Sequence, residues 1–282
     1  EVSMSYLSQL CALMWPQFVS AATGIAALTA MARGLAGRAT MGNFFVDLQR
    51  ATFLVLLPIA VVVAMLNVLG GMPMTLEGVA KALTLEGQEQ LIARGPVAAF
   101  VAIKQLGTNG GGFFGPNSTH PFENPGFLTN MVSTISIILI PMASVWMFGR
   151  IVGRMRHATV LFVVMMLLLL AKAGAAFASE NAPTQAFGAL PGAQDVGNLE
   201  GKELRFGTAA GPLWAVLTTC TSNGSVNCMH DSLNPLTGLV PMVRMWLNAT
   251  FGGVGVGMIN MFLYIVLAVF LAHESLLILL GH

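Results

Sequence analysis

The feature that most constrains this chain is a set of long stretches that contain no Asp, Glu, Lys or Arg. Four of them run between successive charged residues, at 1–33, 50–77, 123–150 and 244–274. Each is long enough to cross a bilayer, because a spanning helix needs about 20 mostly apolar residues. A fifth, at 158–179, contains only Lys172, whose ammonium we expect to reach the membrane interface on its extended stem. The sequence therefore predicts an all-α polytopic membrane protein.

Composition agrees with this class and excludes others. The chain is 55% hydrophobic and only 9% charged, whereas soluble domains carry about 25% charged residues. Its formal net charge of +1 argues against a nucleic-acid partner and against an acidic disordered tail. The three cysteines show no CxxC motif and no zinc spacing, so we interpret them as small apolar residues. The expected surroundings are a lipid bilayer.

The charges of the loops predict the orientation. The connection at 33–50 sums to +2 and that at 150–156 to +3, and short cytoplasmic loops carry the excess of Lys and Arg. The segments 71–94 and 179–207 sum to −1 and −2. We therefore expect the first pair of loops inside and the second pair outside.

Two further apolar segments, at 95–103 and 207–220, are too short to span. Each follows a predicted outer loop and ends in a similar tip, 108–110 (Thr-Asn-Gly) or 222–224 (Ser-Asn-Gly). If each segment crossed the membrane, the alternation of inner and outer loops would fail. If each enters and turns back, every loop keeps its expected side. The sequence therefore predicts two re-entrant half-helices.

The order of outer loop, half-helix, tip and spanning helix occurs twice. Each tip is also followed by His-x-x-x-Asn-Pro, at 120–125 and at 230–235. We therefore divide the chain into a spanning helix that ends a preceding repeat (1–34), a second helix–pore-loop–helix repeat (35–157) and a third (158–282), truncated or divergent at its end.

The chemistry of the tips favours an ion filter. Irregular backbone at membrane depth is tolerated only where it is buried in protein or lines a water-filled cavity. A hydroxyl residue, Asn and Gly allow carbonyl oxygens to replace the hydration shell of an ion, and the half-helix C-termini add partial negative charge. The tips hold no carboxylate, which suits K⁺ better than Ca²⁺ or Mg²⁺. The candidate ligands, acting only through oxygens, are Thr108, Asn109, Gly110, Gly111, Ser222, Asn223 and Gly224. One such tip alone would more often be an ordinary glycine turn, but two matched tips favour the filter.

Both tips closely resemble those of the KdpA family, the potassium-binding and translocating subunits of bacterial Kdp P-type ATPase complexes. The resemblance rests on 107–125 and 221–242 and extends to 5–9, 20–26, 94–99, 200–207 and 251–258. It implies a K⁺-channel-like fold of four helix–pore-loop–helix repeats, related to the Trk, Ktr and HKT transporters. The two tips would then be the second and third filter strands.

The resemblance also implies function, partners and location. K⁺ would be the transported ion, without an organic cofactor, and the partners would be a P-type ATPase catalytic subunit and small accessory membrane subunits. The filter loops would enter from the outer side of the bacterial inner membrane. We find no P-loop and no phosphorylatable Asp in a recognisable setting, so we expect no ATP hydrolysis on this chain.

Two further expectations follow from the resemblance. Gly252, Gly253, Gly255 and Gly257 are similar to a flexible break, or gate, beneath the third filter strand, with close helix packing as the alternative. We expect the first filter strand to lie before Glu1, the fourth repeat to be absent from this sequence, and the tail after Ala272 to diverge from the family.

Two alternative functions stay open at this point. One is a channel or symporter subunit of the Trk, Ktr or HKT type without an ATPase. The other is an intramembrane enzyme that uses His120, Glu123, His230 and Asp231, because His and carboxylate form general bases and metal ligands. We expect these residues instead to support the return loops by hydrogen bonds, and Lys104 to be stabilised by the C-terminal dipole of its half-helix.

Overall fold

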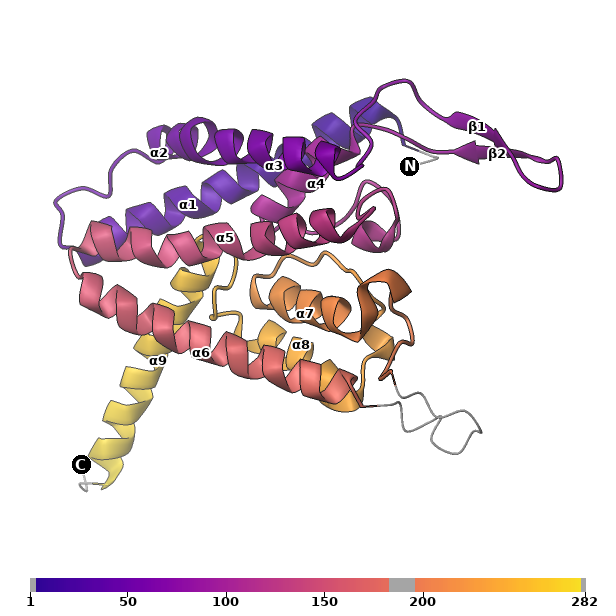
Figure 1. Ribbon diagram of the computed structural model, residues 1–282. Helices are drawn as coiled ribbons and strands as arrows, with labels where there is room; N and C mark the ends of the chain where they lie inside the picture. Colours follow the sequence, from indigo (N-terminus) through magenta and orange to yellow (C-terminus); the bar gives the residue numbers. More distant parts are fainter. Residues whose placement is uncertain (1–3, 183–195, 280–282) are drawn as a thin grey trace.

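The computed structural model describes residues 4–182 and 196–279 of the chain. Long helices lie side by side in a bundle, and a small hairpin projects from one end (Figure 1). Within the described residues, five helices are long and apolar enough to span a membrane: Ser8–Leu35, Phe44–Leu69, Phe127–Val152, Met155–Glu180 and Val256–Ser275. The all-α polytopic class is confirmed.

The first half of the chain builds two of these spans, a half-helix and a return span. Its helices are α1 (Trp15–Leu35), α2 (Phe44–Arg50), α3 (Leu57–Leu69), α4 (Val97–Leu106) and α5 (Phe127–Val152), with π-helical stretches at Ser8–Met14 and Ala51–Leu56. The Asn43 side chain caps α2 by accepting hydrogen bonds from the amides of Phe45 and Val46, at 3.0 and 3.2 Å. The second π-helical stretch joins α2 to α3, so they form one continuous span.

An antiparallel hairpin interrupts the predicted outer loop at 71–94. Its strands are β1 (Ala80–Leu83) and β2 (Glu89–Ile92), and an exposed ion pair joins Lys81 to Glu89 at 2.6 Å. These strands were not predicted from the sequence. The hairpin stands clear of the bundle (Figure 1) and does not alter the helical class.

The second half corrects one predicted boundary. Its helices are α6 (Met155–Glu180), α7 (Gly207–Cys220), α8 (Pro235–Leu247) and α9 (Val256–Leu279). The uncharged stretch at 244–274 was predicted to be one span, but α8 ends at Leu247 and the span begins only at Val256. The break has a backbone cause, since Asn248 ends α8 in the left-handed region with φ 39°.

The connections fall at two ends of the bundle, as loop charge predicts. The links at 36–43 and 153–154 lie at one end, and the hairpin and the return loops lie at the other (Figure 1). With 10 residues, α4 is about 15 Å long, roughly half of the hydrocarbon thickness. The chain then returns to the end it came from, as a re-entrant half-helix requires. Part of the second predicted outer loop, including Gly192, lies outside the described residues.

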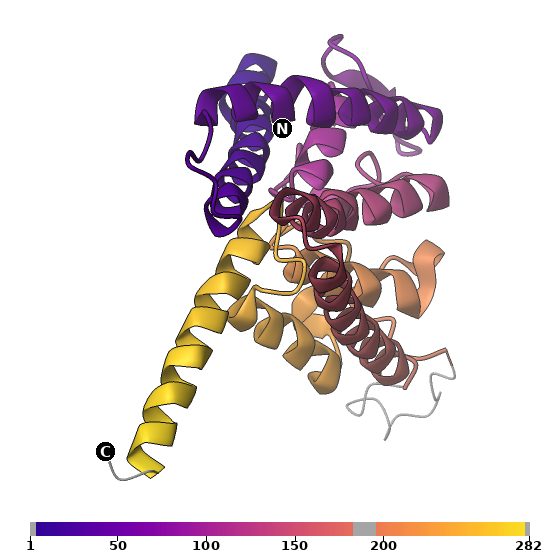
Figure 2. The ribbon, with the colours of Figure 1, turned by 90° about the vertical axis from the view of Figure 1, so that its left-hand side faces the viewer.

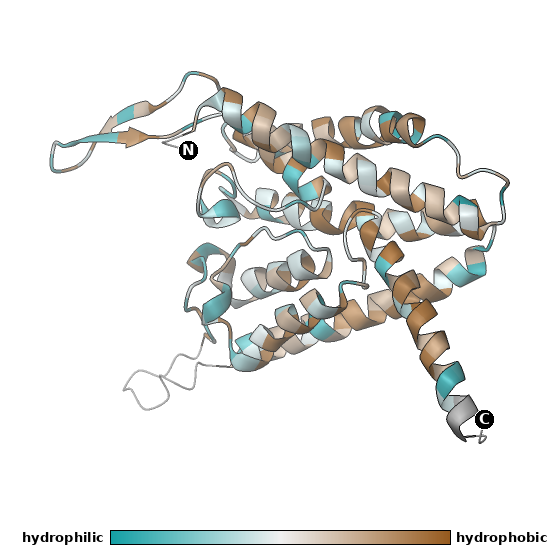
Figure 3. Cartoon of the chain, turned by 180° about the vertical axis from the view of Figure 1, so that it is seen from behind, coloured by the Kyte–Doolittle hydropathy of each residue, from teal (hydrophilic) through white to brown (hydrophobic). Residues whose placement is uncertain are grey.

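Helix α5 is the centre of the packing. It supplies Val132 and Ile140 to a cluster with α1, α3 and α4, and Ile137 and Phe148 to a second cluster with α6 and α7. Apolar residues also cover the outer faces of the long helices (Figure 3), as a bilayer requires. Helix α9 extends away from the bundle (Figure 2), and only 11% of its most apolar window is buried.

Candidate functional site

Both half-helices end with the same hydrogen bond. At the end of α4 the amide of Asn109 donates to the carbonyl of Lys104 at 3.1 Å, and at the end of α7 the amide of Asn223 donates to the carbonyl of Thr218 at 2.8 Å. This bond, which spans five residues, belongs to the Schellman motif at helix C-termini. The two predicted tips therefore start from one local geometry.

The tips also share an unusual alternation of backbone angles. Thr108 and Ser222 lie in the left-handed region, with φ 51° and 55°, which residues with a Cβ rarely adopt. Two residues later Gly110 and Gly224 return to it, with φ 72° and 84°. A strained hydroxyl residue at the same place in both tips is typical of a functional loop. The tips thus match in conformation as well as in sequence.

The strained hydroxyls join the tips to residues 248–255, which we call the glycine loop. The Thr108 Oγ1 accepts a hydrogen bond from the amide of Val254 at 3.2 Å. The Ser222 hydroxyl donates to the side-chain oxygen of Asn248. The glycine loop is therefore attached to both tips at once.

A cavity of about 220 Å³ lies where α1, the two tips and the glycine loop meet. The described residues that line it are uncharged, and they include five of the predicted site residues: Thr108, Asn109, Ser222, Gly252 and Gly253. Those predicted residues that do not line it are Gly110, Gly111, Asn223, Gly224, Gly255 and Gly257. Neutral oxygen donors without a carboxylate are the donor set expected for a weakly hydrated monovalent cation.

The first tip touches the second at Gly110. A Cβ built on Gly110 would lie 2.0 Å from the carbonyl oxygen of Asn223, which is closer than real Cβ atoms come to a backbone oxygen. Among the described residues, a Cβ on Gly224 would meet only the Cα of Gly110, at 3.9 Å. The two glycines are equivalent in sequence, but only Gly110 excludes a side chain by contact.

Helix α1 positions the first tip through residues that the sequence analysis missed. The amide nitrogen of the Asn109 side chain donates to the Gln17 carbonyl at 2.7 Å, and the Ser20 hydroxyl donates to Asn109 Oδ1 at 2.5 Å. The Gln17 side chain donates to the carbonyl of Gly110 at 3.2 Å. The available signal was weak, because Gln17 and Ser20 are two polar residues three apart in a mostly apolar span that also contains Thr23 and Thr29.

Gln105 connects the first half-helix to the second tip and was also missed. Its side chain is fully buried, and its Oε1 accepts hydrogen bonds from the Asn223 side chain at 3.1 Å and the Ser225 hydroxyl at 3.0 Å. The Trp214 indole donates to the same hydroxyl at 3.0 Å. Gln105 therefore joins the end of α4 to the second tip.

A buried ion pair supports the first return loop. Lys104 and Glu123 are both fully buried and paired with each other. The Lys104 ammonium also donates to Asn117 Oδ1 at 2.8 Å and to the Ser118 hydroxyl at 3.0 Å, and Glu123 accepts the amide of Phe114 at 2.9 Å. Lys104 was expected to rely on the helix dipole, and the structure provides a carboxylate as well.

The second return loop has a similar ion pair made from other elements. Glu180, at the end of α6, lies 2.8 Å from the Lys202 ammonium, and both side chains are buried. Glu180 also accepts the Asn198 side-chain amide at 2.9 Å and the amide of Asn234 at 2.7 Å. The Asn of the second His-x-x-x-Asn-Pro motif is thus anchored by the preceding span.

Three buried asparagines join the two return loops. The Asn124 side-chain amide donates to Asn130 Oδ1 at 3.1 Å and to Asn227 Oδ1 at 3.0 Å, and the Asn227 amide donates to Asn130 Oδ1 at 2.8 Å. A satisfied polar network of this kind specifies one arrangement of the surrounding elements.

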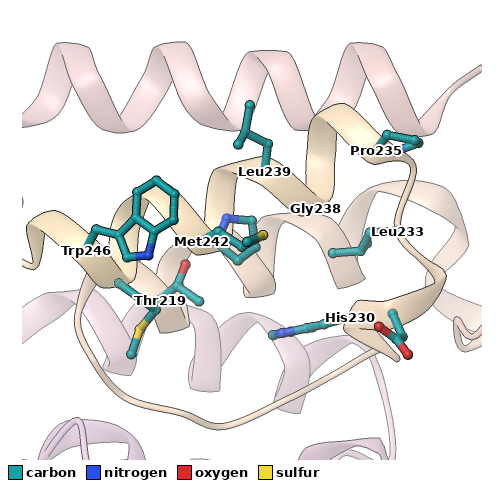
Figure 4. Close-up of a pocket in the computed structure, with 11 residues that line it drawn as sticks. Thr219, His230, Leu233, Pro235, Gly238, Leu239, Met242 and Trp246 are labelled. Atoms are coloured by element: carbon teal, nitrogen blue, oxygen red, sulfur yellow. The ribbon is translucent and has the colours of Figure 1, made fainter.

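The histidines lie apart in the two return loops. His120 stacks on Phe114 with ring centroids 3.8 Å apart, and its Nδ1 accepts the amide of Phe122 at 3.1 Å. This is the predicted supporting role. His230 reaches into a groove of about 710 Å³ that Met242 and Trp246 of α8 also line (Figure 4). Among the described residues no group of three or more His, Cys, Asp or Glu gathers to hold a metal ion.

Burial lowers the pKa of His230 below its ordinary value of 6.5. The folded protein therefore binds fewer protons than the unfolded chain once the pH falls below 6.5, and stability should decrease from there down to the folded pKa. We expect His230→Gln to reduce this acid sensitivity, whereas the exposed-site control His273→Gln retains it. Thermal unfolding of the full-length protein between pH 8 and pH 5 measures the difference. Equal acid sensitivity in the wild type and His230→Gln would contradict this prediction.

The fold and the site together define a class: polytopic α-helical membrane proteins with re-entrant half-helices whose tips meet at an uncharged, oxygen-lined cavity. Within it, the chain belongs to the KdpA family, described as "Potassium-transporting ATPase A subunit", whose sequence profile matches residues 1–278. The family resemblance is thus confirmed, and the match includes most of the tail after Ala272, which we expected to diverge.

Individual relatives agree. The chain is similar to proteins named "Potassium-transporting ATPase potassium-binding subunit" from Pseudomonas putida (51% identity), Pseudomonas aeruginosa (50%) and Rhodospirillum centenum (48%). Each match covers 96% of this chain and 48–49% of the relative. The chain therefore spans about half the length of the curated relatives it matches.

Proposed function

We propose that this chain forms part of a potassium-binding and translocating subunit of an ATP-driven K⁺ uptake complex, and that its two tips are strands of the K⁺ filter. The observation that carries the proposal is the pair of tips, which share sequence, hydrogen bonding and backbone angles and meet at an uncharged cavity. Family membership supports it, because relatives are named as potassium-binding subunits.

In this proposal K⁺ is the cargo and binds through neutral oxygens of Thr108 to Gly111 and Ser222 to Gly224. Hydroxyl, amide and carbonyl oxygens replace its water ligands. The negative ends of α4 and α7 point at the same region and stabilise positive charge there. The hydrogen bonds of Gln17 and Ser20 to the first tip, and of Gln105 to the second, hold the tips in place.

We assign the gate to the glycine loop, at Gly252, Gly253, Gly255 and the adjoining Gly257. The loop contacts both tips, and the Cys220 thiol donates to the carbonyl of Thr250 at 2.9 Å. Opening a path past the loop requires these hydrogen bonds to break. Glycine allows the backbone to change φ and ψ at low cost.

The wider assembly follows from the same proposal. The partners are a P-type ATPase catalytic subunit, which hydrolyses ATP and receives K⁺, and small accessory membrane subunits. The filter loops enter from the outer face of the bacterial inner membrane, and the repeats are divided at 1–34, 35–157 and 158–282. The Trk, Ktr or HKT alternative lacks an ATPase, and the family match favours the ATPase complex.

The decisive experiment uses the full-length protein co-expressed with the neighbouring genes of its operon. We expect K⁺ to be bound and taken up with K⁺-stimulated ATP hydrolysis by the assembled complex. K⁺ uptake that persists without the ATPase subunit would favour a channel or symporter. A full-length complex that neither binds nor moves K⁺ would refute the proposal.

Orientation gives a separate prediction. In a full-length protein with the exposed Cys11 replaced by Ser, a cysteine at Glu86 in the hairpin turn should react with an impermeant thiol reagent added outside. A cysteine at Gly192 should react in the same way, and one at Gly37, between α1 and α2, only after permeabilisation. The reverse labelling pattern would overturn the assignment from loop charge.

A further inference from the structure

Arg244, in the last turn of α8, is a cation buried near the second tip. Its side chain is 2% exposed and lies against the thiol of Cys220, at the end of α7. Guanidinium groups stay charged in proteins, and a buried charge is costly unless it is paired. The buried guanidinium of Arg244 therefore requires a negatively charged partner.

The nitrogens that lack a hydrogen-bond partner indicate which anion fits. Within the described chain, Nε and Nη2 of Arg244 have no partner. These two nitrogens form one edge of the guanidinium plane, and that edge binds both oxygens of a carboxylate in a fork. Lys172 of α6 is close enough for its charge to repel that of Arg244. The neighbourhood thus holds a second cation.

The carboxylates of the described residues do not supply the anion. The two that are fully buried, Glu123 and Glu180, are already paired with Lys104 and Lys202. Among the described residues, no acidic side chain acts on the charge of Arg244. Water could satisfy the two N–H groups but would leave the charge uncompensated.

We propose that Arg244, with Lys172 beside it, receives the carboxylate of an Asp or Glu on a membrane helix that packs against α6 and α8 in the assembled protein. Both nitrogens are buried within this chain, so the carboxylate reaches them only if side chains around Arg244 repack. Lys172, which is partly exposed and has a flexible stem, is one side chain that can move. The helix belongs to the rest of the longer protein, because the chain spans only 48–49% of the length of its relatives. A helix of a partner subunit is a contrary outcome of the test.

The direction in which one substitution changes the melting temperature of the full-length complex tests the proposal. If the carboxylate is present, Arg244→Met strands it and should lower the melting temperature by about 5 °C or more. If Arg244 is unpaired, the same change removes a costly buried charge and should leave the protein equally or more stable, which would overturn the proposal. Arg38→Met, at an exposed site, controls for loss of one positive charge.

If the Arg244→Met protein does not accumulate in cells, a second substitution that restores its accumulation provides the test. Neutralising the one Asp or Glu that binds Arg244, to Asn or Gln, should restore accumulation of Arg244→Met. If Arg244→Met instead reduces co-purification of a partner subunit at least fivefold, while the separately expressed full-length subunit melts as the wild type does, the carboxylate lies on that partner and the assignment to the longer protein is wrong. If no single neutralisation of a membrane-embedded acidic residue rescues the variant, the proposal is wrong.

Discussion

Glu123→Gln in the full-length protein should lower the free energy of unfolding by about 3–5 kcal/mol, because it leaves the ammonium of Lys104 buried without its counter-charge. Lys104→Met should have an effect of similar size, since it strands the Glu123 carboxylate. The first return loop depends on this pair through Asn117, Ser118 and Phe114. Denaturant or thermal unfolding in detergent measures the loss.

A matched control is the exposed pair Lys81 and Glu89 in the hairpin. Glu89→Gln should cost about 1 kcal/mol or less, as exposed ion pairs do. The double variant Lys104→Met with Glu123→Leu should recover part of the loss, because no charge is then left unpaired. If Glu123→Gln and Glu89→Gln lower the free energy of unfolding equally, burial does not determine the contribution of the Lys104–Glu123 pair.

Gly110→Asp should weaken K⁺ affinity and selectivity of the assembled complex without preventing assembly. The new Cβ must displace the carbonyl of Asn223, which it would approach to 2.0 Å, and the new carboxylate places a full charge beside the proposed site. Losing one well-placed oxygen ligand at about 1.4 kcal/mol raises the half-saturating K⁺ concentration roughly tenfold. K⁺-dependent ATPase activity, compared with Rb⁺ and Na⁺, reports both changes.

Gly224→Asp should act in the same direction but less strongly. Its Cβ meets no backbone oxygen of the described chain within 4 Å, although its φ of 84° still disfavours a side chain. Gly87→Asp in the hairpin turn is the control, because Gly87 has a similar φ of 77° and open space around it. If both tip variants match this control in affinity and ion preference, the filter assignment is wrong.

The sequence predicted the features that depend on local pattern. Charge-free length predicted the spans, and charge alternation predicted that α4 and α7 turn back. The repeated Thr/Ser-Asn-Gly predicted tips of one conformation, as Thr108 and Ser222 show. Charge-free length did not show the break between α8 and α9, because the stretch without charged residues runs on across Asn248. Only the resemblance indicated a flexible break nearby, at Gly252 to Gly257.

The sequence did not predict the contacts between distant segments. The hydrogen bonds of Gln17 and Ser20 to the first tip cross 89–93 positions, and that of Gln105 to Asn223 crosses 118. A single polar residue in an apolar helix indicates that a partner exists without indicating which one. The ion pair of Lys104 with Glu123 was missed for the same reason, although both residues were noted separately.

The two buried ion pairs limit how the repeats can be exchanged. In the predicted second repeat (35–157) the lysine comes from the half-helix, Lys104, and its acid from the return loop that follows. In the predicted third repeat (158–282) the acid comes from the preceding span, Glu180, and the lysine from the loop before α7. A chimera that copied α4 in place of α7 would therefore bury a lysine with no acid near it. The repeats are alike in shape, but a single element of one cannot replace its counterpart in the other. A graft between them must carry the span, the half-helix and the return loop together.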